Sequence, residues 1–388
     1  MSHSIIATCE AWLGGAGKIA TQVLRELTSR GLVVDLVSLE TPHLYSNVPG
    51  PTPSLHVPPL VRANAIEPDS LIPLRLAQTI VAVAQSRIAS GLHVTIWGTY
   101  LLPYCAAAYL AADMLRQNGN KVRLVVSPAG SDIWQLGPQL YDVSRHLLFS
   151  PAVDARLTYT RQFAEEIQAQ FHSSGPIETI YPILDRQRFR PPSEVERAEA
   201  RRRHDIDVSD FVLCCHCNMR PIKRPQLVVE LAARLAMRVP SMRCVLLMVG
   251  PYPTEIPKPT GEPPNLRVLW TCACGRVEHE LYAADVAVNW SAHDSFNASL
   301  MEAMAIGLPI VTTDVVGIGP EILVSGTGAL FNDGCLETAT SYLCELAQHR
   351  QLKQHISQVA ADHAAHTFGA ERLLPEYLRV LVGSPSVD

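Results

Sequence analysis

Two carboxylates in the second half of the chain have the residue types and spacing for binding chemistry. Asp294 and Glu302 are separated by seven residues, and Glu302 falls inside an apolar run that predicts a helix over 298–306. Asn297 is placed to cap that helix and Gly307 to end it. An acid in an apolar helix is expensive to bury without a partner, so Glu302 either binds something or lies on a solvated edge.

Two cations follow an earlier apolar strand. The run Phe211–Cys217 predicts this strand, and Pro225 suits the first turn of a helix after it. Arg220 and Lys223 lie in the loop between them, so a planar fork and a point charge stand at the carboxyl end of a strand. Such a pair suits a diphosphate. The alternative is that both side chains are ordinary solvent-exposed charges of a loop.

Glycines follow the first predicted strand. Gly14, Gly15 and Gly17 precede a helix, where small residues let backbone N–H groups approach an anion. Their spacing is not that of a dinucleotide fingerprint, and Asp35 lies in the middle of the next strand. We therefore expect an anion-binding turn or simply a tight strand-to-helix connection, and do not favour a nicotinamide cofactor.

Polar residues also follow two other strands of the first half. Tyr100 comes after Val94–Trp97, and the segment 127–132, which includes Ser131, follows Arg123–Ser127. Parallel sheets bind ligands at the carboxyl ends of their strands. Tyr100 therefore either faces a ligand site or packs against a neighbouring loop.

A metal site is not favoured. The cysteines and histidine of 214–217 lie in an apolar strand, and neither they nor the cysteines of 272–274 have the usual two-residue gap between ligands. The acid-x-acid pattern at 205–207 precedes a strand instead of following one. We expect metal-independent chemistry and reduced, mostly buried thiols.

Composition indicates a folded protein of two domains. The chain has 388 residues, 47% of them hydrophobic and 18% charged, which exceeds the usual size of one core. A net charge of −5 without a basic run does not favour nucleic acid as a partner. The sequence shows no secretory signal and no apolar stretch long enough to span a membrane, so we expect a cytoplasmic protein.

Strands and helices alternate in two blocks, which is typical of α/β proteins with doubly wound parallel sheets. The predicted strands are Ile5–Cys9, Val33–Leu39, Val94–Trp97, Arg123–Ser127, Ala155–Thr160, Phe211–Cys217, Cys244–Val249, Arg267–Trp270, Val286–Asn289 and Pro309–Thr313. The predicted helices are Lys18–Arg30, Ile72–Ala89, Tyr104–Arg116, Arg161–Phe171, Gln226–Met237, Glu278–Ala283 and Ala298–Ile306.

The predicted domains follow from these blocks. The pattern pauses in the polar segment between about 185 and 203, and Pro-rich loops are expected at 41–59 and 251–264. We divide the chain into a first domain over 1–187 and a second domain over 188–366. A C-terminal helix over 367–388 is expected to pack back on the first domain, and the site is expected in the cleft between domains.

These motifs resemble the retaining GT-B glycosyltransferases of glycosyltransferase family 4 along nearly the whole chain. The paired acids Asp294 and Glu302, the cations of 218–224 and the crossover from Tyr159 to Phe189 carry the resemblance. Within the family, the chain looks most like the bacillithiol-pathway L-malate N-acetylglucosaminyltransferases. The features shared with them are the glycine loop from Gly14 to Thr21, Arg-Pro-x-Lys-Arg at 220–224 and Gly-Ser-Asp-Ile at 130–133.

The resemblance implies a GT-B fold, with two Rossmann-like domains facing a cleft. The domain over 1–187 would bind the acceptor and the domain over 188–366 the nucleotide-sugar, and each motif has an implied role. Arg220 and Lys223 would stabilise the diphosphate leaving group. Glu302 would bind the ribose and Asp294 the sugar. The remaining implied donor contacts are Gly15, Ala16, Phe296, Asn297 and Ala298, and the implied acceptor contacts are Ala16, Tyr100 and Ser131.

The chain departs from the family pattern at several positions. Asp294 stands for a usual Glu and Asn297 for a usual Gly; Ala129 replaces a common His. Ala16 replaces the Ser of malate-accepting members, and Pro182 replaces an Asn. The departures concern the sugar and the acceptor more than the nucleotide.

The predicted function is transfer of a sugar, with N-acetylglucosamine first, from a UDP-sugar to a small soluble hydroxyl acceptor. The resemblance implies retention of configuration and no metal or other cofactor. The alternatives are another nucleotide-sugar, a lipid-linked acceptor, or a catalytically degenerate protein that only binds nucleotide. No integral membrane contact is expected, and a homodimer is left open.

Overall fold

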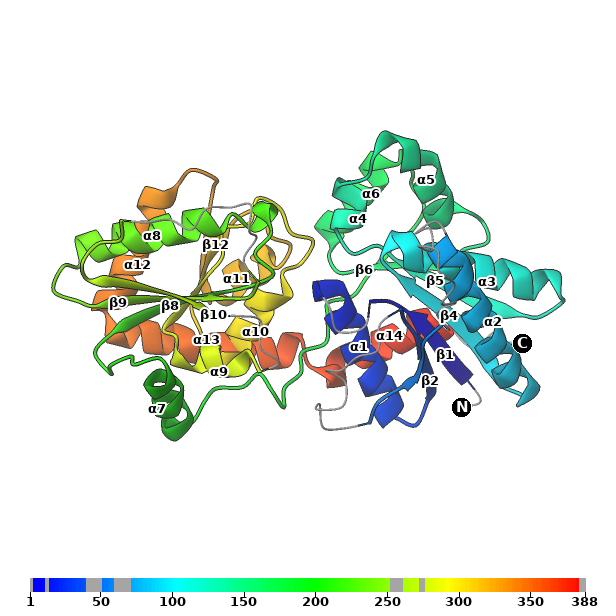
Figure 1. Ribbon diagram of the computed structural model, residues 1–388, viewed down its shortest axis with the longest axis horizontal. Helices are drawn as coiled ribbons and strands as arrows, with labels where there is room; N and C mark the ends of the chain where they lie inside the picture. The colour runs from blue at the N-terminus through cyan, green and yellow to red at the C-terminus, as the bar shows by residue number, and fades with distance from the viewer. Residues whose placement is uncertain are drawn as a thin grey trace, which may run out of the picture. The chain divides into compact units, whose positions relative to one another are not determined.

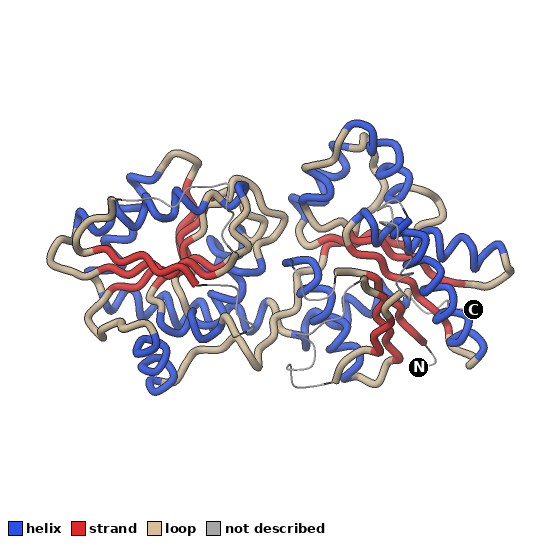
Figure 2. Tube along the Cα trace, viewed as in Figure 1, coloured by secondary structure: helices blue, strands red, loops and turns tan. Residues whose placement is uncertain are grey.

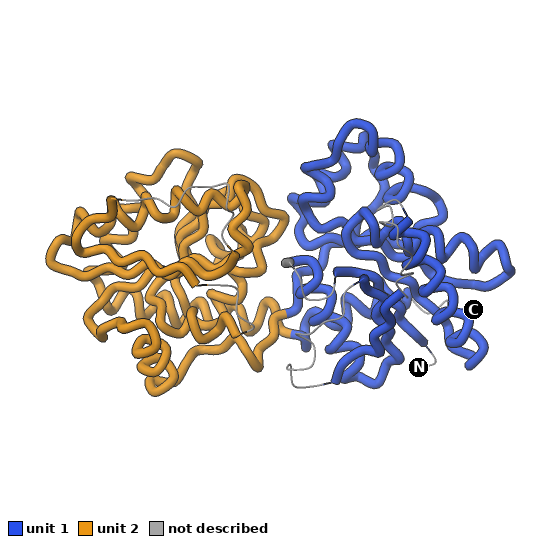
Figure 3. The backbone as a smooth tube through the Cα atoms, in the orientation of Figure 1, with its two compact units in different colours: residues 1–183, 370–388 blue, residues 184–369 orange. Residues whose placement is uncertain are grey.

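The chain forms two compact α/β units in the computed structural model (Figure 1). Unit 1 consists of residues 1–183 and 370–388, and unit 2 of residues 184–369 (Figure 3). The structure describes residues 3–10, 14–39, 51–58, 71–251, 261–271 and 276–383. The boundaries drawn from the sequence fall after 187 and after 366, so each lies three or four residues from the division between the units.

Unit 1 is built on a seven-stranded parallel sheet. Its order is β3-β2-β1-β4-β5-β6-β7. The strands are β1 His3–Thr8, β2 Val33–Val37, β3 Ser54–His56, β4 His93–Thr99, β5 Val122–Ser127, β6 Ala155–Thr158 and β7 Glu178–Thr179. Because the strand order runs outward in both directions from β1 and β4, the carboxyl ends of these two strands form the switch point where such sheets bind ligands.

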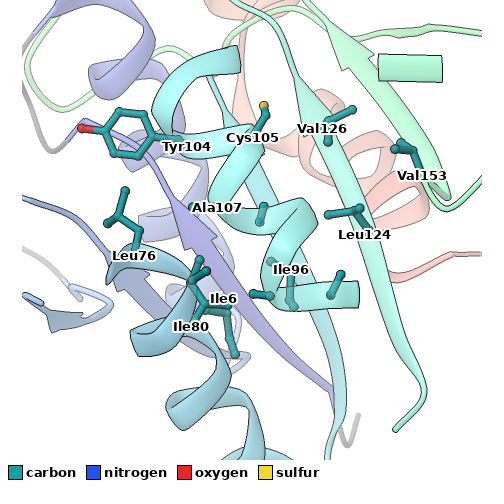
Figure 4. Packing of buried hydrophobic residues seen from close by; sticks show 14 of the residues in the cluster. Ile6, Leu76, Ile80, Ile96, Tyr104, Cys105, Ala107, Leu124, Val126 and Val153 are labelled. Atoms are coloured by element: carbon teal, nitrogen blue, oxygen red, sulfur yellow. The ribbon is translucent and has the colours of Figure 1, made fainter. Parts of the chain in front are cut away.

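Helices cover both faces of this sheet. They are α1 Gly14–Ser29, α2 Ile72–Ala89, α3 Ala106–Gln117, α4 Ser131–Trp134, α5 Tyr141–Phe149, α6 Arg161–Gln170 and α14 Ala370–Val382, with short turns at Leu101–Cys105 and Pro138–Leu140. On one face Ile6, Ile96 and Leu124 pack against α2 and α3, as Figure 4 shows. On the other face Ile5 and Trp97 join a core with α1 and α14.

Asp35 ties three elements of unit 1 together. Its carboxylate is fully buried in β2 and accepts hydrogen bonds from Arg87 Nε at 2.8 Å and Nη2 at 2.7 Å. His56 Nε2 of β3 lies 2.8 Å from the same carboxylate. Since these partners occupy it, Asp35 joins β2 to β3 and α2 and has a structural role.

Unit 2 is built on a six-stranded parallel sheet with the order β10-β9-β8-β11-β12-β13. The strands are β8 Phe211–His216, β9 Cys244–Val249, β10 Leu266–Thr271, β11 Val286–Val288, β12 Ile310–Thr313 and β13 Gly328–Phe331. Here the switch point lies between β8 and β11. The strands that carry the predicted cations and acids are therefore neighbours.

Two groups of helices enclose the sheet of unit 2 (Figures 1 and 2). They are α7 Glu194–Arg203, α8 Pro225–Arg238, α9 Glu278–Ala283, α10 Ala298–Ile306, α11 Gly319–Ser325, α12 Leu336–Gln348 and α13 Arg350–Thr367, with a 3-10 turn at Pro221–Lys223. The core includes Leu213, Leu246 and Val311 from the sheet, with Leu231 of α8 and Leu343 of α12.

A second buried carboxylate joins helices to this sheet. Asp285 stands just before β11 and accepts hydrogen bonds from Arg197 Nη2 at 2.8 Å, Arg201 Nη2 at 2.7 Å and Lys353 Nζ at 2.6 Å. Burial opposes ionisation of Asp285, but these three cations outweigh it and lower its pKa. The carboxylate thereby fastens α7 and α13 to the start of β11.

The predicted α/β architecture is confirmed, with differences in individual elements. Each predicted strand and helix overlaps an observed one, but β3, β7, β13, α4, α5, α7, α11, α12 and α13 were not predicted. The prediction of a pause up to residue 203 is wrong at α7, where a capping box of Ser193 and Glu196 starts a helix in a strongly charged segment. Parts of the expected loops at 41–59 and 251–264 lie outside the described residues, as do the cysteines at 272 and 274.

Among the described helices, none is long and apolar enough to cross a membrane. The eight described cysteines are free, and five of them are buried. Cys214 and Cys215 lie within β8 and serve as small apolar residues of a central strand.

Candidate functional site

The cation loop and the acid loop of unit 2 are fastened to each other at the carboxyl ends of β8 and β11. Arg224 adopts a left-handed backbone conformation with φ 47°. Its guanidinium donates to Trp290 O at 2.9 Å and to Ser291 O at 3.0 Å. The backbone N–H of Ala292 also donates to Ile222 O at 2.8 Å. These bonds place the loop after β11 beside the turn that carries Lys223.

Lys223 and Asp294 form an ion pair across these two loops. Lys223 Nζ donates to Asp294 Oδ2, and each side chain is only 13% exposed. The backbone around Asp294 is held by Gly317, whose N–H donates to Asp294 O at 2.9 Å. A Cβ atom at Gly317 would lie 2.1 Å from Ser295 O, so only glycine permits this approach.

Arg220 stands at the start of the same turn. It is exposed at the N-terminal end of Pro221–Lys223, and its backbone O accepts from Lys223 N at 2.8 Å. The structure therefore brings Arg220, Lys223 and Asp294 to one edge of the sheet.

Asn297 caps α10 in the conformation that a glycine would adopt easily. Its φ is 76°, and its side chain accepts from Leu300 N at 3.3 Å. Its Nδ2 is buried and has no hydrogen-bond partner among the described residues. The cap thus carries an unsatisfied donor three residues after Asp294 in the sequence.

Phe296 and Ala298 flank this cap. The Phe296 ring is buried against Phe368 with a centroid distance of 5.7 Å, so only its backbone is available to a ligand. Ala298 is the first residue of α10, whose first N–H groups point outward at the helix N-terminus. An anion is stabilised at such a terminus.

Glu302 has a histidine as its partner. His216 Nε2 lies 2.8 Å from Glu302 Oε2, and the two side chains are 8% and 14% exposed. The pair joins the last residue of β8 to the second turn of α10. It accounts for the burial of an acid among the apolar residues of this helix.

His216 was not predicted as a site residue. In the sequence it stands among the cysteines of 214–217, which were considered only as a weak metal candidate. The available signal was its place at the end of the same strand that leads to Arg220. Only the fold, however, shows that α10 brings Glu302 to this strand end.

Arg188 is a second missed residue near Glu302. Its Nη2 donates to Glu278 Oε2 at 2.7 Å. Burial lowers the pKa of Arg188, but the bond to Glu278 and the charges of Glu278 and Glu302 outweigh it, so the pKa is raised. The guanidinium of Arg188 is thus close enough to Glu302 for their charges to interact.

The charged side chains of the loop after β8 act on Cys217. A hydrogen bond with Cys215 lowers the pKa of Cys217, and the charges of Lys223 and Arg220 lower it further against burial and Asp294.

Unit 1 gathers a second set of predicted residues at the carboxyl ends of β1, β4 and β5. Gly15 and Ala16 lie in the first turn of α1, which begins four residues earlier than predicted. Tyr100, with φ 73°, donates to or accepts from Ser131 Oγ at 2.9 Å through its hydroxyl. This bond brings the two predicted acceptor residues together.

Asp132 organises the loops around Tyr100 and Ser131. Its carboxylate accepts from Leu101 N at 2.9 Å and from Gly130 N at 2.7 Å. Burial raises the pKa of Asp132 even though these backbone N–H groups oppose the shift. The side chain therefore acts as an internal brace for the segment that presents Ser131.

The acid-x-acid pair at 205–207 lies away from the edge that carries Lys223, since it precedes β8. Asp205 is 93% exposed, and Asp207 accepts from Arg243 Nη1 at 3.3 Å. Across the described part of the chain, no group of three or more histidine, cysteine or acidic side chains is arranged to hold a metal ion.

A cavity of about 1080 Å³ in unit 2 does not coincide with the predicted site residues. It is lined by α7, by α13 and by residues before β8, β11 and β12, including Arg197, Asp285 and Lys353. These residues stand at the amino ends of the strands. Ligand chemistry in parallel sheets belongs to the opposite ends, so we place the candidate site by the loops after β8 and β11.

Two doubly wound units, with cations and paired acids at the carboxyl edge of the second, are the arrangement of the GT-B fold. Residues 210–361 match the model of the family described as glycosyl transferases group 1. The chain is also similar to N-acetyl-alpha-D-glucosaminyl L-malate synthase of Bacillus anthracis, at 26% identity over 385 residues that cover 97% of this chain and 96% of that protein. The resemblance predicted from the motifs is thereby confirmed: the chain is similar to glycosyltransferases over nearly its whole length.

Other relatives match a smaller share of the chain. D-inositol 3-phosphate glycosyltransferase of Rhodococcus erythropolis is 27% identical over 226 residues, which cover 53% of this chain and 49% of that protein.

Solved structures share the fold over nearly the full length. The Anabaena protein Alr3699/HepE, solved in complex with UDP and glucose, has a TM-score of 0.74 at 15% identity and covers 98% of this chain and 99% of its own. Sucrose-phosphate synthase from Thermosynechococcus elongatus has a TM-score of 0.72 at 15% identity, with 98% and 100% covered. At this level of identity the likeness concerns the fold.

Proposed function

We propose that this glycosyltransferase moves a sugar, N-acetylglucosamine in the first instance, from a UDP-sugar to a hydroxyl group of a small acid, with retention of configuration. The observation that carries the proposal is the Lys223–Asp294 pair beside Arg220 at the switch point of unit 2. The full-length similarity to an enzyme named for N-acetylglucosaminyl malate supports the donor sugar and the acceptor class. HepE, a structural neighbour, was solved with UDP and glucose, which supports a UDP-linked donor.

The cations would stabilise the leaving group. As the glycosidic bond breaks, negative charge develops on the diphosphate, and donors fixed in advance lower the barrier most. The ammonium of Lys223 has three donors, so it can keep its bond to Asp294 while it meets a phosphate oxygen. Arg220, exposed in the same turn, offers a planar fork for a second contact. Because these cations meet the charge, the proposal requires no metal ion.

The acids would hold the sugar and the ribose. Asp294 lies at the turn before α10 and would accept from sugar hydroxyl groups. The unsatisfied Nδ2 of Asn297, three residues later in the same loop, would donate to an oxygen of the sugar. Glu302, two turns further along the same segment, would accept from the ribose hydroxyls.

The acceptor would bind to unit 1. The first turn of α1 presents N–H groups beside Gly15 and Ala16, which suits a carboxylate. The joined hydroxyls of Tyr100 and Ser131 would orient the acceptor. Attack on the same face as the departing diphosphate would give retention without a protein nucleophile.

A lipid-linked acceptor has less support. Such an acceptor would need an apolar or basic face on unit 1, and α2 is an amphipathic helix that could offer one. Its Leu76, Ile80 and Val83 are buried. Its Arg87 is bound to Asp35, so this apolar face and this cation are already used within unit 1.

The proposal is tested by crossing donors with acceptors and following product by mass spectrometry. The donors are UDP-N-acetylglucosamine, UDP-glucose and GDP-mannose; the acceptors are L-malate and D-inositol 3-phosphate. We expect transfer from UDP-N-acetylglucosamine, with L-malate the better acceptor, and loss of transfer in Lys223→Ala. Nucleotide binding without transfer in any combination would indicate a degenerate binding protein.

A further inference from the structure

We propose that His216 is a positioning residue that holds the Glu302 carboxylate in the orientation needed to recognise the ribose hydroxyls of the donor. The inference rests on the proposed function, because it presupposes that Glu302 meets a nucleotide. It adds a residue that lies outside the cation and acid motifs.

The geometry supports a fixed carboxylate. His216 Nε2 is 2.8 Å from Glu302 Oε2, and both groups are largely buried. Its ring is carried by the last residue of a fully buried central strand, so its position is set by the sheet. An ionised carboxylate has about four lone-pair sites, and one imidazole N–H occupies one of them. This bond restricts the rotation of the carboxylate and so favours one direction for its other lone pairs.

The need for such a support follows from the setting of Glu302. The rest of its helix consists of residues such as Leu300, Met301 and Met304, which are buried and offer no hydrogen bonds from their side chains. A glutamate has three rotatable side-chain bonds, so an unsupported carboxylate would not hold one orientation. A vicinal diol is recognised well only if both acceptor sites are correctly placed.

The inference distinguishes His216 from the phosphate-binding residues. Lys223 would meet the diphosphate, which is the same in UDP and in 2′-deoxy-UDP. Glu302 would meet the ribose, which differs between them. A loss of orientation at Glu302 should therefore appear as a loss of discrimination between the two nucleotides.

The experiment measures the affinity of the full-length protein for UDP and for 2′-deoxy-UDP by calorimetry. We expect wild-type protein to prefer UDP, and His216→Ala to lower the ratio of the two affinities about tenfold, which is the scale of one charge-assisted hydrogen bond. His216→Gln keeps an N–H donor with similar reach and should retain the ratio within about twofold. Lys223→Ala should weaken both nucleotides and leave the ratio unchanged.

A matched control is available in the same unit. His363 Nε2 lies 2.9 Å from Glu321 Oε2, so His363→Ala removes a similar bond between two residues to which no nucleotide contact is assigned. It should leave the ratio at the wild-type value. If His216→Ala does not fold, His216→Asn is measured in its place. The amide of asparagine is shorter than that of glutamine, so His216→Asn should lower the affinity ratio that His216→Gln retains.

Three outcomes decide the matter. An unchanged ratio in folded His216→Ala or His216→Asn, together with a lowered ratio in Glu302→Gln, overturns the positioning role alone. An equal loss in His216→Ala and His363→Ala shows a general effect on stability and also overturns it. Wild-type protein that binds neither nucleotide contradicts the proposed function, and the inference falls with it.

Discussion

Lys223 and Asp294 are 71 residues apart in the chain, yet the structure buries them as one ion pair. Replacing Lys223 by Met leaves Asp294 without a counter-charge, so we expect unfolding to become easier by about 3 kcal/mol. The double variant Lys223→Met/Asp294→Asn removes both charges and should recover most of that stability. Urea denaturation measures both effects.

Activity should not follow stability in these variants. Both lack the cation that would face the leaving group, so we expect kcat to fall by about 10²-fold or more in each. Recovery of activity in the double variant would show that Lys223 matters only for folding. Release of UDP from the donor sugar provides the rate.

Replacing Asn297 by glycine or by alanine should change the stability of the protein by different amounts. Its φ of 76° suits glycine, whereas alanine is strained there and also loses the cap on α10. We expect Asn297→Gly to stay within about 1 kcal/mol of wild type and Asn297→Ala to lose about 2 kcal/mol. Equal stabilities for the two variants in urea denaturation would contradict the cap and its left-handed conformation.

The residues that could be found from sequence are those whose spacing along the chain carries the information. Asp294 and Glu302 belong to one short segment, and Arg220 and Lys223 to another, so each pair was predicted. His216 and Arg188 were not, because their relation to Glu302 depends on elements that are distant in sequence. Spacing along the chain reveals partners only within one element.

At the scale of elements, Asp285 decides how α7 and α13 attach to the sheet. Asp285→Asn removes the charge that three cations surround, and we expect a loss of about 3 kcal/mol in unfolding free energy. The effect should depend on pH. Because the folded pKa is lowered, the wild-type advantage is complete above the unfolded value of about 3.9 and is lost as pH falls through the folded pKa.

Urea denaturation of both proteins at pH 7 and below pH 4 measures this dependence. A difference that grows in acid would have the wrong sign for a carboxylate held by cations. Glu199→Gln serves as a surface control, since Glu199 of α7 pairs only with exposed Arg202 and Arg203 and should change stability little.

Helix α7 also shows what periodicity does not reveal. Its sequence, EVERAEARRR, has almost no apolar stripe, so the charged segment was interpreted as a pause. The helix is held by its capping box and by the bonds of Arg197 and Arg201 to Asp285 and to backbone oxygens. By contrast, the limits of β9, α2 and α9 were predicted to the residue, because in each the apolar pattern and the residues that end it indicate the same limits.

At the scale of the molecule, the chain crosses from unit 1 to unit 2 and returns with α14. Leu373, Leu374 and Tyr377 of this helix are buried in the core of unit 1 against residues such as Ile5 and Leu24. We expect residues 1–183 alone to be unfolded or aggregated, and a fusion of 1–183 to 370–388 to recover structure. Circular dichroism and proteolysis compare the two, and a stable 1–183 fragment would contradict this role of α14.

Unit 2 is one continuous segment and should behave differently. We expect residues 184–369 to fold as a fragment and to bind UDP, since Arg220, Lys223 and Glu302 all lie within it. Calorimetry measures the affinity. A folded fragment that binds no UDP would show that the nucleotide site needs more than unit 2.

The central claim is that the protein transfers N-acetylglucosamine from UDP-N-acetylglucosamine to a small hydroxy acid. Its most direct measurement is a mass-spectrometric and NMR assay of wild-type protein with UDP-N-acetylglucosamine and L-malate. We predict a product with the mass of N-acetylglucosaminyl malate and an α linkage, because UDP-N-acetylglucosamine is the α-anomer and its configuration is retained. A β-linked product would contradict retention. If a folded protein that binds UDP formed no product with L-malate or with D-inositol 3-phosphate, the proposed transfer would be contradicted.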